Sequence, residues 1–348
     1  MSDREWKLPG DWKITRSVVP LAEVHDWSFA FLGVPELWKE VQGEGVKAAL
    51  LDTGCDLRHP DLQGAIAAEA DFTRSAFGVD DRLGHGTFVA GMIGARANNI
   101  GVAGIAPLSQ LYIAKVLGDN GSGTEDQIYA GFKWAMQQGV NIISMSLGGP
   151  MMSDRLRGLF QEFVSQPGHF IFAAAGNDGQ LDSVNCPGIW PETICVGAID
   201  QNGNLARFSS RGPRVDVLCP GVEMLSTIPG GYGTMSGTSM ATPEVAGVAA
   251  LGLAKHLKLG GNTPLDTVET MRARLKKTGR DGGTNTDGVK IIDPAHYFAD
   301  LDEPHLPPVV PPSDGDGPVG LKLGKWPVRL AIEHLHGRLT LTTWLSTD

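Results

Sequence analysis

Six short apolar runs recur between residues 46 and 221, and longer amphipathic stretches separate several of them. Glycine or turn-forming polar residues bound these runs, which is typical of buried strands. Strands that alternate with helices favour a mostly parallel sheet covered on both faces. The sequence therefore predicts an α/β protein of three layers, α/β/α, with a mostly parallel central sheet and strands in the runs 46–51, 110–118, 140–149, 170–177, 193–199 and 215–221.

Three stretches carry the start and stop signals of helices. TEDQIYAGFKWAMQQG opens with a capping-box spacing and ends on Gly139, which can adopt the left-handed conformation of a helix stop. Residues 153–166 place their apolar side chains on one helical face. In TPLDTVETMRARLKKTG we expect Thr263 as the cap, Pro264 at the first helical position and Gly279 as the stop.

Composition and charge exclude two classes of partner. Hydrophobic residues make up 42% of the 348 residues, enough for a sizeable core. The net charge is −10, and no stretch is basic enough for a nucleic-acid footprint. No apolar run approaches the roughly 20 residues that span a bilayer. We therefore expect neither nucleic acid nor a membrane span.

The N-terminus and the cysteines bear on the compartment. The start, MSDREWKLPGDWKITRS, is charged and has no apolar core, so it does not resemble a signal peptide. A cytoplasmic location is the expectation, with export by another route left open. The four cysteines form no CxxC pair, so neither a zinc nor a redox motif is indicated, and reduced thiols are expected. A bridge between Cys186 and Cys195 stays an open alternative.

Shifts in composition divide the chain into four parts. Residues 1–42 form an entry segment of mixed polarity, and residues 43–300 carry the strand and helix pattern. Residues 301–320 are rich in proline, glycine and aspartate, which indicates a linker. Residues 321–348 alternate apolar and polar side chains like a hairpin too small to fold alone. This appendage could dock on the main domain or pair with another chain, which makes an oligomer an open prediction.

Four polar residues flanked by small ones carry the side chains that acyl transfer requires: Asp52, His85, Asn177 and Ser239. A serine hydroxyl is a poor nucleophile unless an imidazole takes its proton, and a carboxylate must orient that imidazole. An Asn amide and a backbone N–H at a helix start can stabilise an oxyanion. Each residue alone reads as an ordinary turn or cap residue. The context G-T-S-M-A lacks the GxSxG elbow, which argues against an α/β-hydrolase.

The sequence around these residues is similar to the sequences of a known family. LLDTGCDLRHPDL, GHGTFVAGMIG, AAGNDG and GTSMATPEVAG resemble the signature blocks of the subtilisin-like serine peptidases, and KVLGDNGSGT and IISMSLGGP add two more. The six blocks follow in order and cover roughly residues 40 to 295. LDTGCD and the short N-terminal extension most resemble the intracellular bacterial subtilisins. The order Asp, His, Ser is also that of subtilisin.

The resemblance implies a serine endopeptidase with a subtilisin-like fold. Ser239 would attack the peptide bond and form an acyl-enzyme, with His85 as general base and acid and Asp52 orienting it. Asn177 and the Ser239 backbone N–H would form the oxyanion hole. A dedicated processing peptidase, or a transpeptidase on the same triad, is an alternative. A catalytically silent binding module is the rival from another class.

The resemblance also implies where protein or peptide substrates would lie. An extended peptide would run between two walls and bond to both like an added strand. A pocket would receive the residue before the scissile bond, and an amide side chain at its floor would make it polar. The implied residues are Gly121, Ser122 and Gly123 for one wall, Ser146, Leu147 and Gly148 for the other, and Gly176 and Asn185 for the pocket.

A structural calcium ion is the cofactor that the resemblance implies. Asp61 would supply a carboxylate and Asn98 a side-chain oxygen, and Arg96, Ile100 and Val102 would supply backbone carbonyls. Oxygen-only ligation from a loop suits Ca²⁺. ANNIG also fits a plain loop, which is the alternative. The sequence does not assign the remaining ligand from the N-terminal segment.

Three departures from the family pattern are visible. Phe88 and Glu244 stand where the family usually has histidine, and neither position belongs to the triad. No long folded pro-domain precedes the peptidase blocks, and residues 1–20 are too short to fold alone. We hypothesise that residues 1–20 lie across the active site or its rim and restrain activity. Local rules would begin the helix after Ser239 with Thr242 as cap, whereas the family resemblance begins it at Ser239.

Overall fold

The computed structural model describes residues 5–9, 14–18, 22–149, 153–261, 265–284, 286–302, 328–335 and 338–345. The chain divides into two compact units, residues 1–304 and residues 305–348. The first unit holds the predicted main domain. The second unit holds a pair of strands and is treated separately.

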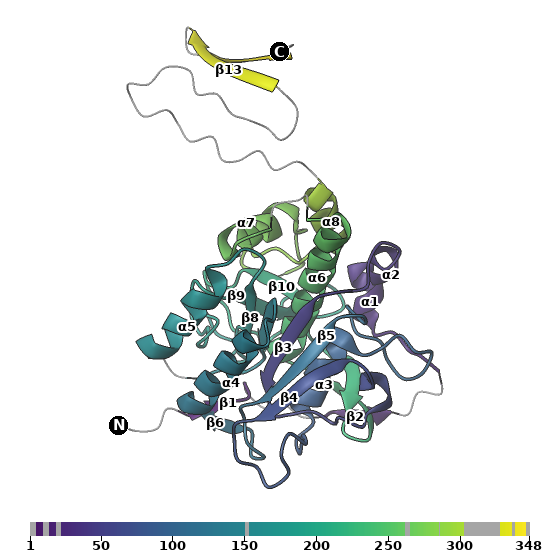
Figure 1. Ribbon diagram of the computed structural model, residues 1–348. Coiled ribbons are helices and arrows are strands. Elements are labelled where there is room, and N and C mark those ends of the chain that lie inside the picture. The colour runs from purple at the N-terminus through teal and green to yellow at the C-terminus, as the bar shows by residue number, and fades with distance from the viewer. Residues whose placement is uncertain are drawn as a thin grey trace. The chain divides into compact units, whose positions relative to one another are not determined.

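A seven-stranded sheet forms the centre of the first unit (Figure 1). Every neighbouring pair in it is parallel. The strand order is β10-β9-β8-β7-β3-β5-β4, so β3 lies near the middle. The strands are β3 (Lys47–Asp52), β4 (Ile66–Asp71), β5 (Gln110–Lys115), β7 (Ile142–Met145), β8 (Phe170–Ala174), β9 (Ile194–Ile199) and β10 (Val217–Pro220).

All six predicted strands are present in the central sheet, and the sequence analysis missed one strand of this sheet. The missed strand is β4, whose sequence IAAEAD contains no long apolar run. It lies at the edge of the sheet beside β5, and its residues are only half-buried or exposed. An edge strand needs fewer large apolar residues than a central one, which is why the apolar-run criterion passes over it.

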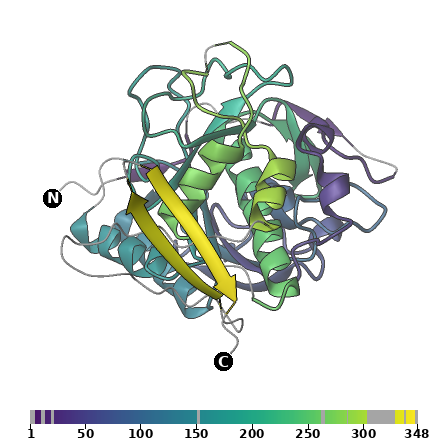
Figure 2. The ribbon, with the colours of Figure 1, turned by 90° about the horizontal axis from the view of Figure 1, so that it is seen from above.

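Helices cover both faces of the sheet, as predicted. On one face α3 (His85–Gly94) and α6 (Thr238–Lys258) pack against the strands, and on the other α4 (Glu125–Gln137) and α5 (Asp154–Val164) do. Figure 2 shows the teal helices α4 and α5 side by side. Strand residues alternate between the two core layers: Leu50 packs in the layer with α6, and Leu51 in the layer with α4. The fold is therefore the three-layer α/β/α architecture.

The helix ends test the capping predictions. Thr124 and Gln127 form the predicted capping box of α4, and Gly139 has the predicted left-handed conformation (φ 67°). The predicted helix 153–166 is α5, capped by Ser153. The prediction for α7 (Val268–Thr278) is wrong at its start, because Thr267 caps this helix in a capping box with Thr270. Thr263 and Pro264 lie outside the described residues, and Gly279 ends the helix as predicted.

Helix α6 begins at Thr238, so the local prediction of a start at Thr242 is wrong and the family resemblance is right. Pro243 consequently lies inside the helix. A proline there removes the N–H that would bond to the carbonyl four residues earlier. That carbonyl belongs to Ser239, and it accepts a hydrogen bond from the Ser146 hydroxyl instead (2.8 Å). The proline therefore leaves no carbonyl without a partner.

Helix α6 is buried from Thr238 to Lys255. Small residues let its neighbours approach closely: a Cβ on Gly247 would lie 2.6 Å from Ile105, and one on Gly252 would lie 2.8 Å from Tyr297. The helix can therefore run through the core only with this sequence of small residues. The burial fixes the place of Ser239 in its first turn.

Shorter elements surround this frame. Phe88, where the family usually has histidine, is fully buried in an apolar cluster with Met92, Met235 and Met240. The remaining elements are α1 (Trp27–Leu32), α2 (Val34–Leu37), the 3₁₀ turn η1 (Pro60–Leu62), α8 (Pro294–Asp302), the antiparallel sheet of β11 (Met224–Ile228), β12 (Gly231–Met235) and β2 (Arg16–Val18), and the pair β1 (Glu5–Lys7) and β6 (Ser122–Thr124).

The second unit contains two antiparallel strands, β13 (Val328–Leu335) and β14 (Arg338–Leu345). They fall in the stretch for which the sequence predicts a hairpin, and pairing with another chain stays a prediction. Of the predicted linker 301–320, the first two residues are the last of α8, and the residues from 303 to 327 and from 336 to 337 lie outside the described residues.

Two further expectations concern the cysteines and the membrane. All four cysteines are buried and none of them forms a disulfide, so Cys186 and Cys195 are not bridged. Among the described residues, the helices are too short or too polar to cross a bilayer.

Glu244 is a buried carboxyl group on α6, with 1% of its surface exposed. The Ser28 hydroxyl donates to its Oε1 (2.5 Å), and the Cys219 thiol lies 3.8 Å from its Oε2. Burial, followed by the nearby Asp26 carboxylate, raises the pKa of Glu244 well above its ordinary value. The carboxyl group is therefore neutral in the folded chain at pH values where an exposed glutamate is charged.

This raised pKa predicts the sign of a pH effect on stability. A carboxyl group whose pKa is higher in the folded state contributes stability below its unfolded pKa, and this contribution is lost as pH rises through the folded pKa. Glu244→Gln keeps the shape without the charge. We expect its unfolding temperature, relative to wild type, to rise as the pH increases above the unfolded pKa of a glutamate and to level off once the pH exceeds the raised folded pKa. Calorimetry at several pH values measures this, and a constant difference would contradict it.

Candidate active site

Asp52 and His85 form a buried hydrogen-bonded pair. Asp52 is the last residue of β3, and His85 is the first residue of α3. The His85 Nδ1 lies 2.8 Å from the Asp52 Oδ1, and the exposed fractions of the two side chains are 0% and 2%. A carboxylate on Nδ1 fixes the ring so that Nε2 faces away from it. The predicted orienting contact is therefore present.

One close backbone approach and two hydrogen bonds hold this pair in place. The turn after β3 touches the start of α3 so closely that a Cβ on Gly86 would lie 2.2 Å from the Gly54 carbonyl oxygen. The Thr53 N–H donates to the Asp52 Oδ1 (2.7 Å), and the Gly86 N–H donates to the Thr53 Oγ1 (2.9 Å). Glycines at these positions are required, because any side chain would separate the carboxylate from the imidazole.

A second buried carboxylate, Asp81, supports the same corner. Its Oδ1 accepts hydrogen bonds from the Thr53 hydroxyl (2.9 Å) and the Gly84 N–H (2.9 Å). Its Oδ2 accepts from both the Thr87 N–H and the Thr87 hydroxyl (2.8 Å each). A negative charge at the N-terminus of α3 is favourable. The sequence analysis missed Asp81, because it lies in a loop that shows no periodic pattern.

Ser239 lies in the first turn of α6 and exchanges two hydrogen bonds with Ser146. Its hydroxyl donates to the Ser146 carbonyl oxygen (3.3 Å), and the Ser146 hydroxyl donates back to the Ser239 carbonyl (2.8 Å). Ser146 follows the end of β7, and β7 is paired with β3. The serine therefore lies at the same edge of the sheet as Asp52, where the carboxyl ends of the parallel strands meet.

Asn177 lies beside the start of α6 and is oriented by Thr238. Its Oδ1 accepts hydrogen bonds from the Thr238 N–H and the Thr238 hydroxyl (3.0 Å each). This leaves the Nδ2 as a donor, and it donates to the carbonyl oxygen of Pro9 (2.9 Å). Thr238 was missed as a positioning residue. The only signal for it is its place directly before the candidate nucleophile.

The two predicted channel walls hold an extended strand, and that strand is β1 of the chain itself. Lys7 exchanges two backbone hydrogen bonds with Gly148 (2.9 and 3.0 Å). On the other side β1 pairs antiparallel with β6, with Trp6 opposite Gly123 and Lys7 opposite Ser122. The Leu8 N–H adds a hydrogen bond to the Gly121 carbonyl (3.3 Å). Residues of both predicted walls thus bond to one peptide segment.

Side chains of this strand alternate between burial and exposure. Glu5 and Lys7 are exposed, whereas Trp6 and Leu8 are buried. Trp6 is fully buried and packs in an apolar cluster that includes Leu147 of the channel wall. It lies so close to Gly149 that a Cβ there would come 2.8 Å from the indole ring. The strand is therefore anchored by side-chain packing as well as by backbone hydrogen bonds.

The predicted pocket residues also come together. A Cβ on Gly176 (φ 109°) would lie 2.5 Å from the Asn185 Nδ2, and one on Gly148 would lie 3.4 Å from the Asn185 Cβ. The Asn185 Nδ2 donates to the Asp178 Oδ2 (3.2 Å). Asp178 was not predicted as part of this group. An amide and a carboxylate therefore meet beside the two glycines.

The predicted calcium residues gather around the buried carboxylate of Asp61. The Val102 N–H donates to its Oδ2 (2.8 Å), and the Asn98 Nδ2 lies 3.3 Å from its Oδ1. The Arg96 N–H donates to the Asp61 backbone carbonyl (2.7 Å). Ile100 lies on the same loop and is exposed. No cluster of three or more His, Cys, Asp or Glu side chains is found within the described part of the chain.

Two residues outside the predicted set border this loop. The Glu23 carboxylate accepts a hydrogen bond from the Asn99 N–H (3.0 Å), and the Val24 N–H donates to the Gly101 carbonyl (2.7 Å). Burial and the Asp61 carboxylate raise the pKa of Tyr232 to about 12. A Cβ on Gly101 would lie 2.1 Å from both the Asp61 Oδ2 and the Tyr232 hydroxyl, so only glycine fits there.

Comparison with known proteins places the chain in a family. The profile of the subtilase family matches residues 43–291. An intracellular serine protease of Paenibacillus polymyxa is 46% identical over 226 residues, which are 62% of this chain and 69% of that protein. A subtilisin of Bacillus pumilus is 45% identical over 68% of this chain and 84% of its own length. The major intracellular serine protease of Bacillus subtilis is 43% identical over 62% of this chain and 71% of that protein.

These matches cover most of the three-layer unit, including the segments that carry Asp52, His85, Asn177 and Ser239. They favour the endopeptidase over the transpeptidase and the silent module, because the similar proteins are proteases. The chain belongs to the subtilase family and is a subtilisin-like serine protease.

Proposed function

We propose that this chain hydrolyses internal peptide bonds through an acyl-enzyme on Ser239. In this proposal His85 is the general base and acid, Asp52 orients it, and Asn177 with the Ser239 backbone N–H stabilises the oxyanion. The observation that carries the proposal is the contact of the Asn177 Nδ2 with a peptide carbonyl oxygen, that of Pro9, at the start of α6. An oxyanion formed by attack of Ser239 would need a donor at this place.

The proton path follows from the ring orientation. The Asp52 contact to Nδ1 leaves the His85 Nε2 to accept the Ser239 proton when the hydroxyl turns from the Ser146 carbonyl. The Ser239 Oγ then bonds to the substrate carbonyl carbon, and the carbonyl oxygen becomes negative. His85 returns the proton to the leaving amine as the C–N bond breaks. A water molecule repeats the sequence and releases the acid.

The burial of the pair strengthens this chemistry. Asp52 and His85 are almost fully buried, so the imidazolium that forms is stabilised by a nearby carboxylate in a medium of low polarity. The Asn177 amide is already oriented by Thr238, so no donor must reorganise as charge develops. Both arrangements favour the transition state over the bound substrate.

A fluorophosphonate probe tests the nucleophile. We expect wild type to be labelled on Ser239 and to hydrolyse a peptide p-nitroanilide, and Ser239→Ala to do neither. Asn177→Ala should keep the labelling site but lose about 2.7–4 kcal/mol of transition-state stabilisation, the range known for the corresponding donor of a subtilisin. Mass spectrometry locates the adduct. A folded wild type that takes no label on Ser239 would refute the mechanism.

The substrates proposed are proteins or peptides bound as an extended strand between the walls at Gly121–Gly123 and Ser146–Gly148. The support is the pairing of β1 with both walls. Gly176 and Asn185 are proposed to receive the residue before the scissile bond. A cytoplasmic location is proposed from the relatives that are named intracellular.

We further propose that β1 restrains this activity, as the sequence analysis hypothesises for residues 1–20. The support is that β1 and the two residues after it, Leu8 and Pro9, already use the wall hydrogen bonds and the Asn177 donor that a substrate would need. A segment tethered to its own site competes at a high effective concentration. Activity on a dilute substrate is then set by the fraction of molecules in which β1 has left the channel.

Trp6→Ala tests the restraint. Loss of a buried tryptophan costs about 3–5 kcal/mol in a well-packed site, which far exceeds the 1.4 kcal/mol that changes an equilibrium tenfold. We expect kcat/KM on a short peptide p-nitroanilide to rise at least about tenfold. The limit is the value reached when β1 has left the channel in nearly all molecules. Glu5→Ala, on the same strand but exposed, is the matched control and should change it less than twofold. Equal rates for the Trp6 variant and wild type would rule out the restraint.

We also propose a structural Ca²⁺ at Asp61. Asp61 and Asn98 would supply side-chain oxygens and Arg96, Ile100 and Val102 backbone carbonyls, and Glu23 is the acidic residue of the N-terminal segment nearest this loop. The residues fit the ion because a buried carboxylate, an amide side chain and the backbone of a loop meet at one place, and Ca²⁺ prefers such oxygen ligands. The ion would hold the loop and the adjoining N-terminal segment together.

Chelation tests the calcium site. An ion present at a hundred times its Kd stabilises the folded state by about 2.7 kcal/mol, and removing it should lower the unfolding temperature by about 5–10 °C. Asp61→Asn should lower it similarly and make it insensitive to EDTA. Scanning calorimetry with and without millimolar calcium measures both. The proposal fails if EDTA leaves the wild-type unfolding temperature unchanged.

A further inference from the structure

The segment after the proposed pocket floor, from Gly188 to Thr193, turns its backbone carbonyls toward a half-buried guanidinium group. That group belongs to Arg214, in the loop before β10. Arginine carries five N–H donors in a planar fork, so one side chain can satisfy several carbonyls at once. The Arg214 Nη2 donates to the carbonyls of Gly188 (3.2 Å), Trp190 (2.6 Å) and Thr193 (3.2 Å), and its Nε donates to Ile189 (2.9 Å).

A second guanidinium group completes the set. Arg272 of α7 donates from Nη2 to the carbonyls of Pro191 (3.0 Å) and Thr193 (2.9 Å). Its Nε donates to the Asp216 Oδ1 (2.8 Å), which also lies 3.2 Å from the Arg214 Nη1. Asp216 is 2% exposed, so a buried carboxylate lies between two cations. A buried carboxylate needs such partners.

This cluster is connected to the pocket by the backbone. The Ile189 N–H donates to the Asn185 carbonyl (3.1 Å), and the Thr193 hydroxyl donates to the Pro187 carbonyl (3.0 Å). At the other end, the Gly149 N–H donates to the Cys186 carbonyl (2.9 Å), next to the channel wall. The segment that carries Asn185 is therefore held by the wall on one side and by the arginines on the other.

The carbonyls explain why a cation is required there. Carbonyl oxygens that point at one place repel each other and are costly to bury without a donor. Oxygen atoms gathered in this way suit a cation, and here the cation is part of the chain. Removing Arg214 would leave the carbonyls of Gly188, Ile189 and Trp190 without this donor, so the segment would have to turn and carry Asn185 with it.

We propose that Arg214 is a positioning residue whose guanidinium group, with that of Arg272, fixes the pocket at Asn185 and thereby the choice of residue before the scissile bond. The proposal rests on the proposed function of Gly176 and Asn185. Arg214 acts on the substrate only through the segment 185–193. It is distinct from the triad, which lies on β3, α3 and α6.

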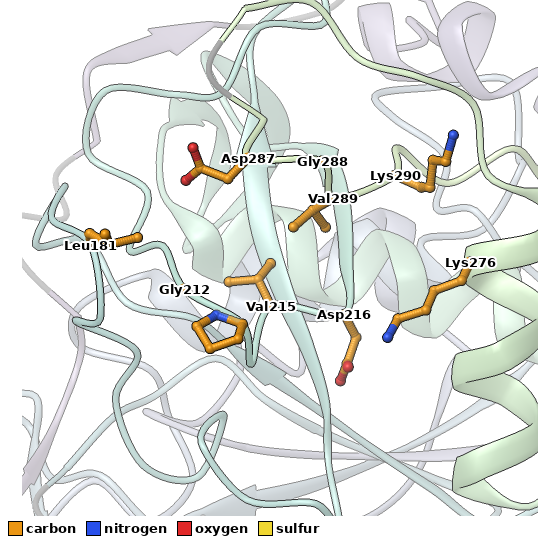
Figure 3. A pocket seen from close by; sticks show the side chains of 10 residues that line it. Leu181, Gly212, Val215, Asp216, Lys276, Asp287, Gly288, Val289 and Lys290 are labelled. Atoms are coloured by element: carbon orange, nitrogen blue, oxygen red, sulfur yellow. The ribbon is translucent and has the colours of Figure 1, made fainter.

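A pocket gives a small ion access to this cluster. It has a volume of about 500 Å³ and is lined by Asp216, Val215, Lys276 and Lys290, among others (Figure 3). Asp216 is the carboxylate that both arginines share. A guanidinium ion from solution can therefore reach the space that Arg214→Ala would open. This makes chemical rescue a feasible test.

The experiment compares two peptide p-nitroanilides that differ only in the residue before the scissile bond, phenylalanine or alanine. Displacing a site by about 1 Å can change rates by 10²-fold, so we expect Arg214→Ala to shift the wild-type kcat/KM ratio between them at least tenfold toward unity. Fluorophosphonate labelling of Ser239 should change less than twofold. Guanidinium chloride at 20 mM should restore the ratio, and NaCl at 20 mM should not.

Two further variants keep the test decisive. Arg214→Lys retains the charge but not the planar fork, so its kcat/KM ratio between the two substrates should also move toward unity. This variant replaces Arg214→Ala in the test if the alanine variant does not fold. Arg58→Ala removes an arginine whose side chain is 87% exposed, and the kcat/KM ratio of this variant should equal that of wild type. An unchanged ratio in folded Arg214→Ala, or equal rescue by NaCl, would overturn the proposal. Failure of wild type to label would instead refute the proposed function.

Discussion

The structure depends on the burial of one helix. Helix α6 is buried from Thr238 to Lys255, and it packs against four of the seven strands and against α3. A helix buried on all sides cannot shift without disturbing the core around it, because protein interiors are close-packed. Its first turn therefore has a fixed position relative to the strand ends. That turn carries Ser239, and the preceding glycine lies close enough to Asn177 for a Cβ to come 3.2 Å from its amide nitrogen.

The central sheet could be predicted because its strands are apolar runs between glycines, and the helices because their caps are local. The misses have local causes too. β4 lies at an edge and has no long run, and Thr263 competes with Thr267 as a cap within the same short stretch. The start of α6 shows the limit of local rules, since Pro243 is tolerated only because the distant Ser146 hydroxyl satisfies the Ser239 carbonyl. No sequence window contains both partners.

The four catalytic residues could be proposed because each lies in a family signature block, and the structure brings Asp52 to His85 and Asn177 to the start of α6. The supporting residues were not found, for a physical reason. Asp81 and Arg214 act through hydrogen bonds to backbone groups, and Thr238 acts through hydrogen bonds to the Asn177 side chain. Such bonds leave no periodicity in the sequence. Their role appears only when the loops are placed.

The N-terminal segment contacts the substrate channel, strand β12 and the proposed calcium loop in turn. Beyond β1 the chain is held at Thr15, whose N–H bonds to the Thr234 carbonyl (2.8 Å), and again at Val24, which bonds to Gly101 of the proposed calcium loop. Residues 10 to 13 join Pro9 to Ile14, so β1 is a ligand on a short tether. Tethering at high effective concentration makes even a weak intrinsic affinity sufficient for occupancy. Loss of the anchors on β12, at Thr15 and in β2, would lengthen the tether as far as Val24 and weaken the restraint without altering a contact of β1.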